Sequence, residues 1–171
     1  MSISTYKFSQ QLAKAETVER ELDEYFQGQG IKVHPASSDA QRAGIDRWFR
    51  MPLQKGFIPV EYKADWKASE TGNVFVELIS VLRGASIDAL GWAYSSQADW
   101  LFYCLPAEGY ALHIEFAELR KHLAVWVKQF QQRTIKNEDT DKYSGYQTTG
   151  LLVPMMVFSE ISRPPIKLNF G

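Results

Sequence analysis

The sequence predicts a single α/β domain in which helices flank a central mixed β-sheet. Residues 9–27 and 116–133 space their apolar side chains by three and four positions, as on the buried face of an amphipathic helix. Between them lie short runs rich in β-branched and aromatic residues, which are typical of strands. At 171 residues the chain has about the length of one domain and can bury a sizeable core.

Composition and charge restrict the class of protein. With 45% hydrophobic and 23% charged residues, the chain has the balance of a folded globular protein and not of a disordered one. We expect a soluble cytoplasmic protein without a membrane segment, because the longest apolar run, residues 151–158, is too short to span a bilayer. The single cysteine, Cys104, stands in an apolar run and is predicted to be a core residue.

The first half of the chain predicts one helix followed by three strands. The helix over residues 9–27 leads into a short strand at 31–34. A polar loop at 35–44 separates this strand from a second one at 45–51, and residues 56–65 form the third.

The second half is expected to add strands, one long helix and several polar connections. The expected strands cover residues 73–81, 98–106, 109–116 and 151–161, and the second and third of these form a hairpin. The helix covers residues 116–133. The expected connections are a turn at 67–72, a loop with a short helix at 84–97, a polar loop at 134–150 and a proline-rich tail at 162–171.

An acid and a base stand two residues apart on the third strand. Glu61 and Lys63 therefore project from one face of it, and Asp46 lies on the preceding strand. Two close carboxylates repel each other unless a proton or a cation intervenes, and oxygen ligands favour Mg²⁺ or Mn²⁺. Such a metal ion polarises a bound water for attack on a phosphodiester, and an adjacent lysine can orient that water or neutralise developing charge. A plain ion pair on the strand surface would also explain Glu61 and Lys63.

Together with the residues before it, this pattern resembles a known family. The segments "VERELDEYFQGQGIKVHPASSDAQRAGIDRWF" and "IPVEYKAD" are similar to the N-terminal half of archaeal-type Holliday-junction resolvases, within the PD-(D/E)xK restriction-endonuclease-like superfamily. The similarity covers about residues 16–65. A helix with an E-R-E-L sequence, a serine-containing loop, an aspartate-bearing strand and an E-x-K strand occur here in the family's order.

The resemblance implies a fold, a reaction and a set of site residues. The implied fold has an αβββαβ core with extra strands, and the implied activity is that of a Mg²⁺-dependent DNA endonuclease that leaves a 5′-phosphate. Mn²⁺ would substitute, no organic cofactor is expected, and a homodimer is expected. The implied catalytic residues are Glu19, Asp46, Glu61 and Lys63. The implied metal ligands are Glu19, Asp46, Glu61 and the main-chain carbonyl of Tyr62.

Further polar residues are predicted to contact DNA. Between residues 32 and 67 there are seven Lys and Arg against four acids, although the whole chain has a net charge of −1. From this region we select Arg42 and Arg47, together with Ser38 in the loop where resolvases often carry a functional serine. Gln97 is the candidate from the segment that follows the E-x-K strand.

The chain departs from the family pattern in places, and other functions stay open. Ile45 replaces the proline that often precedes the aspartate, and an extra strand at 73–81 precedes the expected crossover. Glu77 on this strand is a further acid that could face the site. The alternatives are a catalytically inactive DNA-binding or accessory protein of the same fold, and an interaction domain that binds no nucleic acid. The metal-site hypothesis requires Asp46 and Glu61 to share one face of the sheet.

Overall fold

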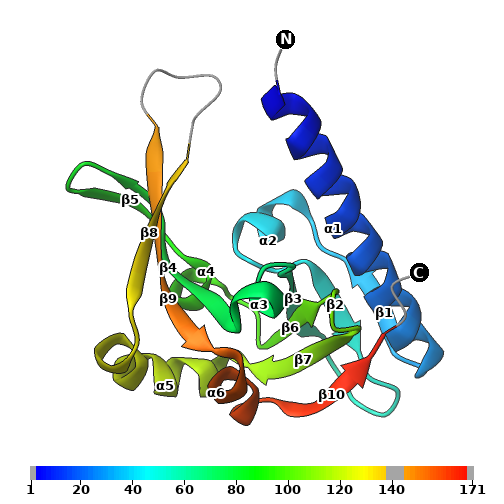
Figure 1. Cartoon of the computed structure of the whole chain (residues 1–171). Helices are drawn as coiled ribbons and strands as arrows, with labels where there is room; N and C mark the ends of the chain where they lie inside the picture. Colours follow the sequence, from blue (N-terminus) through cyan, green and yellow to red (C-terminus); the bar gives the residue numbers. More distant parts are fainter. Residues whose placement is uncertain (1–2, 138–144, 169–171) are drawn as a thin grey trace.

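Two β-sheets and a long N-terminal helix dominate the fold (Figure 1). The computed structural model describes residues 3–137 and 145–168, with side chains from residue 13 onward. Within these residues no helix is both long and apolar enough to cross a membrane.

The larger sheet has six strands in the order β1-β2-β3-β6-β7-β10. β3 and β6 are parallel, and all other neighbours in this sheet are antiparallel. Its strands are β1 (Lys32–Pro35), β2 (Arg47–Arg50), β3 (Ile58–Ala64), β6 (Trp100–Leu105), β7 (Tyr110–Glu115) and β10 (Arg163–Lys167). The chain therefore has an α/β fold with a mixed central sheet.

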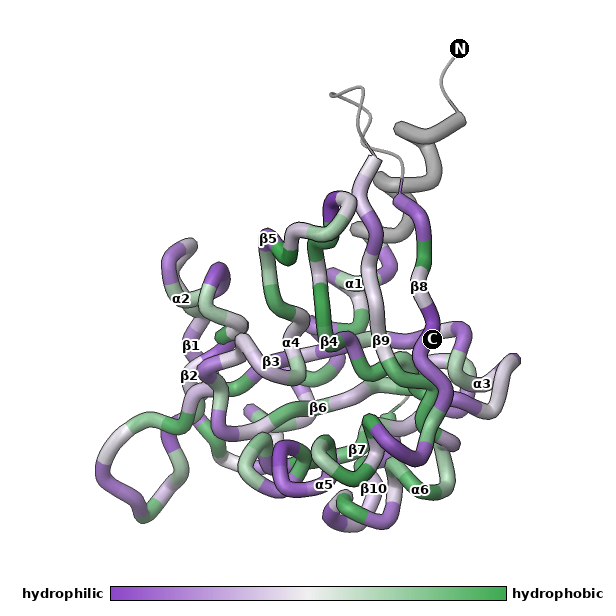
Figure 2. Tube along the Cα trace, turned by 90° about the vertical axis from the view of Figure 1, so that its left-hand side faces the viewer, coloured by the Kyte–Doolittle hydropathy of each residue, from purple (hydrophilic) through white to green (hydrophobic). Residues whose placement is uncertain are grey.

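The smaller sheet has four antiparallel strands in the order β5-β4-β9-β8. Its strands are β4 (Asn73–Arg83), β5 (Ser86–Leu90), β8 (Gln132–Asn137) and β9 (Tyr146–Pro154). β4 is hydrophobic along much of its length, whereas the edge strand β8 is mostly hydrophilic (Figure 2). On β4, Val74, Val76 and Leu78 are buried and alternate with less buried residues, so one face of this sheet points into the core.

The helices cover the central sheet from both sides. α1 (Ile3–Gly28) packs Leu22 and Phe26 against Phe49 of β2 and Phe102 of β6. On the opposite face, α5 (Phe116–Gln129) and the smaller sheet enclose the second part of the core. The short helices are α2 (Ser38–Arg42), α3 (Ala68–Thr71), α4 (Trp92–Ser95) and α6 (Met155–Glu160). In Figure 1, α1 rises on one side of the molecule and the smaller sheet on the other.

Most elements predicted from periodicity are confirmed, with shifted ends. The first helix, the three strands that follow it, the strand at 73–81 and the hairpin at 98–116 all form. The helix predicted over 116–133 ends earlier, at Gln129, because Phe130 is extended and β8 begins at Gln132. Cys104 is fully buried, and burial raises the pKa of its thiol to about 12.

Four of the predicted connections contain regular structure that was not expected. The loop at 35–44 contains α2, which Ser37 caps by accepting a hydrogen bond from the Ala40 N–H. The turn at 67–72 contains α3, and the segment at 84–97 contains β5 in addition to the expected short helix. The polar loop at 134–150 forms parts of β8 and β9, although residues 138–144 of that prediction lie outside the described residues.

Two predictions at the C-terminal end were also wrong, one for the strand at 151–161 and one for the proline-rich tail at 162–171. The strand predicted at 151–161 stops at Pro154, after which α6 begins. The predicted tail contains β10, which pairs with β7 at the edge of the larger sheet across an irregular register around Pro164 and Pro165. An edge strand tolerates prolines because one side of it needs no ladder partner.

His113 on β7 provides a test of this packing. Its ring lies 4.7 Å from the Trp100 ring and 4.6 Å from the Phe102 ring. Burial, assisted by Arg163 and opposed by Glu115, lowers the pKa of His113 to about 4. The folded state therefore disfavours the imidazolium relative to the unfolded chain.

We predict that His113 destabilises the protein in mild acid. Its contribution to stability is present above its ordinary pKa of 6.5 and is lost as the pH falls toward 4. The free energy of unfolding of wild type, measured in urea, should fall relative to that of His113→Phe between pH 7 and pH 4. Parallel stability curves for the two proteins over this range would contradict the packing described for His113.

Candidate active site

The site begins where β2 separates from β3. Their register pairs Arg47 with Val60. The preceding residue, Asp46, donates its N–H to the Val60 carbonyl at 2.8 Å, and its Oδ2 accepts the Tyr62 N–H at 2.7 Å. β2 ends at this point, so the Asp46 carboxylate, and not a main-chain carbonyl of a neighbouring strand, accepts the hydrogen bond from Tyr62 of β3.

Alternation along the two strands places Asp46 and Glu61 on the same side. Val60 and Tyr62 pack in the core beneath α1, and Arg47, opposite Val60, also reaches α1. Residues one position along each strand point to the other face. Asp46 and Glu61 therefore share one face, and their charges are close enough for Asp46 to raise the pKa of Glu61.

Glu61 is an unusually buried acid. The residue is 2% exposed, and its Oε1 lies 2.6 Å from the Lys63 Nζ. The other oxygen, Oε2, is buried and has no hydrogen bond of normal geometry among the described residues, although the Ser96 hydroxyl lies close enough to lower the pKa of Glu61. Burial raises the pKa of Glu61, with Lys63 opposing this rise. A buried carboxylate oxygen without a donor is costly, which favours a site built to receive a ligand.

Lys63 lies among three carboxylates. Burial by itself would lower the pKa of Lys63, but the charges of Glu61, Asp46 and Glu77 raise it overall. Glu77 comes from β4, and burial raises the pKa of its carboxyl, as it does for Glu61. The smaller sheet thus brings a fourth charged group to the site.

On the side of α1, an ion-pair network connects the helix to β2 and β3. Arg47 binds Asp23 through Nε at 2.9 Å and Glu19 through a terminal guanidinium nitrogen at 3.0 Å. The hydroxyl of Tyr62 donates to Asp23 at 3.0 Å. Burial raises the pKa of Glu19, and the charge of Asp46 adds to this while Arg47 opposes it. Glu19 therefore lies near Asp46 but is held by Arg47.

The main chain of Tyr62 points into the same region. In an extended strand the N–H and C=O of one residue point to the same side. Since the Tyr62 N–H is directed at Asp46, its carbonyl also faces the side that β2 has left.

The acidic groups at the site amount to a close pair of carboxylates and not to a larger cluster. Within the described part of the chain, no three His, Cys, Asp or Glu side chains are grouped to hold a metal ion. Glu19 is engaged with Arg47, which leaves Asp46 and Glu61 as the close pair. Mg²⁺ commonly takes one or two carboxylates and keeps several waters.

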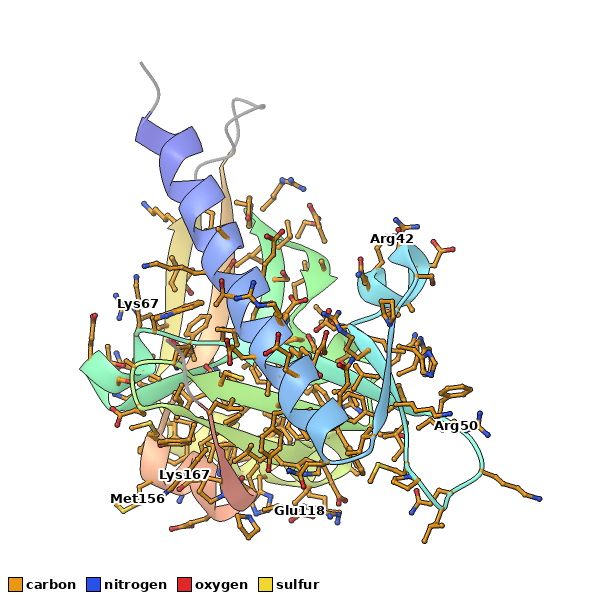
Figure 3. All side chains as sticks on the ribbon, turned by 90° about the vertical axis from the view of Figure 1, so that its right-hand side faces the viewer. Arg42, Arg50, Lys67, Glu118, Met156 and Lys167 are labelled. Atoms are coloured by element: carbon orange, nitrogen blue, oxygen red, sulfur yellow. The ribbon has the colours of Figure 1, made fainter. Side chains whose placement is uncertain are left out.

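The residues predicted to bind DNA have different positions. Ser38 begins α2 and is exposed, and Arg42 on the same helix is exposed and paired with Asp39 (Figure 3). Gln97 is exposed, and its N–H donates to the Ala43 carbonyl at 2.8 Å. These three can be reached from solvent. Arg47 differs, because its side chain is 13% exposed and is bound by two carboxylates.

Two residues that support the site were missed in the sequence. Ser96 is buried and donates its hydroxyl to the Gly44 carbonyl at 2.9 Å, next to Ile45 and Asp46. Gly44 has φ +76°, and a Cβ there would come within 2.9 Å of the Ser96 Cα, so only glycine fits. Asp23 was also missed, although it follows Glu19 by four residues and so lies on the same face of α1.

Comparison of the chain with protein-family models, with curated proteins and with solved structures finds no match.

The structure assigns Arg47 to the attachment of α1, which leads to a stability prediction. Arg47→Met should lower the free energy of unfolding by about 1–3 kcal/mol, because Asp23 and Glu19 would lose their partly buried partner. Arg42→Met is the matched control. Its side chain is 73% exposed, so the change should be within about 0.5 kcal/mol. Equal losses in both variants, measured by urea unfolding, would disprove the assignment.

Proposed function

We propose that the protein is a Mg²⁺-dependent DNA endonuclease with a PD-(D/E)xK type of core. The observation that carries the proposal is the convergence of Asp46, Glu61 and Lys63 on one side of β3. The sequence pattern required this arrangement, and residues placed on opposite faces would have excluded it.

The order and direction of the strands support the proposal. α1 is followed by β1, β2 and β3 as an antiparallel meander, and the chain then returns to β6, which is parallel to β3. Apart from α2 between β1 and β2, this order is the one expected of the proposed αβββαβ core, with α4 as a short helix in the crossover. α3, β4 and β5 are inserted before α4, where the sequence indicated an extra strand.

Asp46 and Glu61 would hold the Mg²⁺ ion, with the Tyr62 carbonyl as a further ligand. Such an ion supplies a polarised water and stabilises negative charge on a phosphodiester. Glu61 is buried beside Lys63 and Ser96, and Asp46 is fixed by the Tyr62 N–H. Both oxygen donors are therefore positioned before any ligand arrives, which reduces the cost of binding.

Lys63, Arg47 and Ser96 would position the substrate and the parts of the site that hold the metal. Lys63 forms an ion pair with Glu61. Its Nζ could also donate a hydrogen bond to a water or to a phosphate oxygen beside the carboxylates. Arg47 fixes α1 against β2 through its ion pairs with Asp23 and Glu19. Ser96 holds the turn that precedes Asp46.

A surface ion pair is a poorer explanation of the E-x-K pattern. Glu61 is 2% exposed, whereas ion pairs without a functional role are mostly found between exposed side chains. Burying an acid with one unsatisfied oxygen lowers stability, so the arrangement is better explained by ligand binding.

The direct test is cleavage of a DNA panel in Mg²⁺. Linear, flapped and four-way DNA are each incubated with wild type, Asp46→Asn, Glu61→Gln and Lys63→Met. Each substitution removes a metal ligand or the cation beside it, so each should lower the cleavage rate by about 100-fold or more. Removal of Mg²⁺ with EDTA should abolish cleavage, and Mn²⁺ should restore it.

Matched control variants identify a contaminating nuclease. Glu118→Gln and Lys128→Met make the same chemical changes on α5 and should cleave like wild type. If all variants nick DNA equally, the activity belongs to another protein. If wild type binds DNA but cleaves nothing in the panel, the inactive DNA-binding alternative replaces the proposal.

A further inference from the structure

A cavity of about 390 Å³ adjoins the candidate active site on the side of the smaller sheet. It shares Lys63 with the site. The residues of its lining that matter here are three cations and three aromatics: Lys63, Lys67, Arg133, Phe75, Trp92 and Tyr103. No step of the proposed cleavage uses the other five.

The three aromatic side chains come from three elements, β4, α4 and β6. Phe75 stands on β4, on the face opposite the buried Val74 and Val76. A Cβ on Gly150 of β9 would come within 2.7 Å of the Phe75 Cζ, so this glycine lets the ring lie against the neighbouring strand. Trp92 begins α4, and its ring centroid is 6.2 Å from that of Tyr103. Phe75 and Trp92 are each only partly buried, which leaves ring surface for stacking.

The cations make the cavity suitable for an anion. Lys67 and Arg133 are both exposed, and neither is paired with a carboxylate among the described residues. Asp65, the acid in the lining, is already occupied by the hydroxyl of Tyr103 at 2.6 Å and by two backbone N–H groups at the start of α3. These hydrogen bonds hold the Asp65 carboxylate in place but leave its charge, so the lining carries three cations, one of them paired with Glu61, against the one anion of Asp65.

We propose that this cavity holds one unpaired nucleotide of the DNA strand, next to the bond that is cut. The inference rests on the proposed function and specifies its substrate as DNA with an unpaired nucleotide, such as a flap or a bulge. Base stacking on aromatic rings combined with Lys and Arg contacts to phosphate is the usual chemistry of single-strand recognition. Small-ligand pockets measure roughly 300–1,000 Å³, so this cavity admits a single nucleotide but not a duplex.

The shared lysine connects occupancy of the cavity to cleavage. The Nζ of Lys63 is 2.6 Å from the Glu61 Oε1, and Lys63 also lines the cavity. A nucleotide in the cavity would therefore contact the same lysine that pairs with the active-site carboxylate. A base in an intact duplex must first be unpaired and unstacked to enter, whereas an unpaired base enters without that cost. The cavity would therefore select substrates by local DNA structure and not by sequence.

Fluorescence of 2-aminopurine tests binding separately from cleavage. The analogue is placed at the first unpaired position of a flapped duplex, and wild type is titrated in without Mg²⁺. Stacking in the cavity should quench the fluorescence. Phe75→Leu and Trp92→Leu should weaken binding by about tenfold or more, whereas Phe57→Leu, in the exposed loop after β2, should not.

The cations are tested with a matched pair of lysines. Lys67 and Lys167 are both exposed, and Figure 3 shows them on different parts of the surface. Lys67→Gln should weaken binding and reduce the slope of log K against log[salt] by about 0.7, whereas Lys167→Gln should change neither. Equal effects of the two substitutions would overturn the inference.

Cross-linking of wild type covers the case in which an aromatic variant does not fold. With 5-iodouracil at the unpaired position, cross-links should fall in the tryptic peptides 68–83 and 84–120, which contain the three aromatics. Cross-links confined to other peptides would overturn the inference. So would loss of quenching on addition of a free deoxynucleoside monophosphate at the concentration of the oligonucleotide, because the cavity would then be a small-molecule site.

Cleavage in Mg²⁺ separates this inference from the proposed function. Flapped DNA should be cut at least about tenfold faster than the same sequence fully paired. Equal rates would overturn the inference and leave the nuclease proposal standing. Quenching and cross-links at the cavity without cleavage of any DNA would overturn the nuclease proposal instead.

Discussion

The candidate site depends on one hydrogen bond, in which the Asp46 carboxylate accepts the Tyr62 N–H. β2 stops pairing with β3 at Arg47, and the next backbone N–H of β3 on that side needs another acceptor. A buried N–H without a partner is costly, so the aspartate is required by the sheet as well as by the chemistry. The same bond fixes the carboxylate beside Glu61 and leaves the carbonyl edge of Tyr62 open.

Several buried or half-buried acids lie at the site, and their burial lowers the stability of the folded protein. Burial raises the pKa of Glu19, Glu61 and Glu77, which means that each carboxylate is held in an environment that disfavours its charge. Lys63 and Arg47 offset part of this cost, each from a different face of the sheet. Proteins retain such strained groups chiefly at functional sites. The two cations thus have separate roles, since Arg47 attaches α1 and Lys63 faces the cavity.

The sequence predicted those features that depend on residues close together in the chain, such as the alternation along a strand or the spacing along a helix. The period-2 alternation of β3 was sufficient to place Glu61 and Lys63 on one face, and the spacing on α1 identified its buried side. β8 could not be predicted, because it is an exposed polar edge strand whose only support is pairing with β9. The end of β9 at Pro154 was missed because the apolar residues of the strand run into α6 without a change of composition there.

Contacts between distant segments were beyond the reach of pattern and spacing. Arg47 was interpreted as a DNA contact because it lies in a basic stretch, but its partners Asp23 and Glu19 lie more than twenty residues earlier on α1. The cavity is likewise assembled from separate elements, among them β3, β4, α4, β6 and β8, and none of these segments carries a motif for it. The function of each residue therefore follows from the sheet topology and not from the neighbouring sequence.

The central claim is that Asp46 and Glu61 form a divalent-metal site. It is tested most directly by anomalous diffraction from crystals soaked in MnCl₂, since Mn²⁺ scatters anomalously and takes the same oxygen ligands as Mg²⁺. The account predicts an anomalous peak about 2 Å from an oxygen of Asp46 and from the Oε2 of Glu61. A peak elsewhere on the protein, or none while Lys63 remains bonded to Glu61, would contradict it.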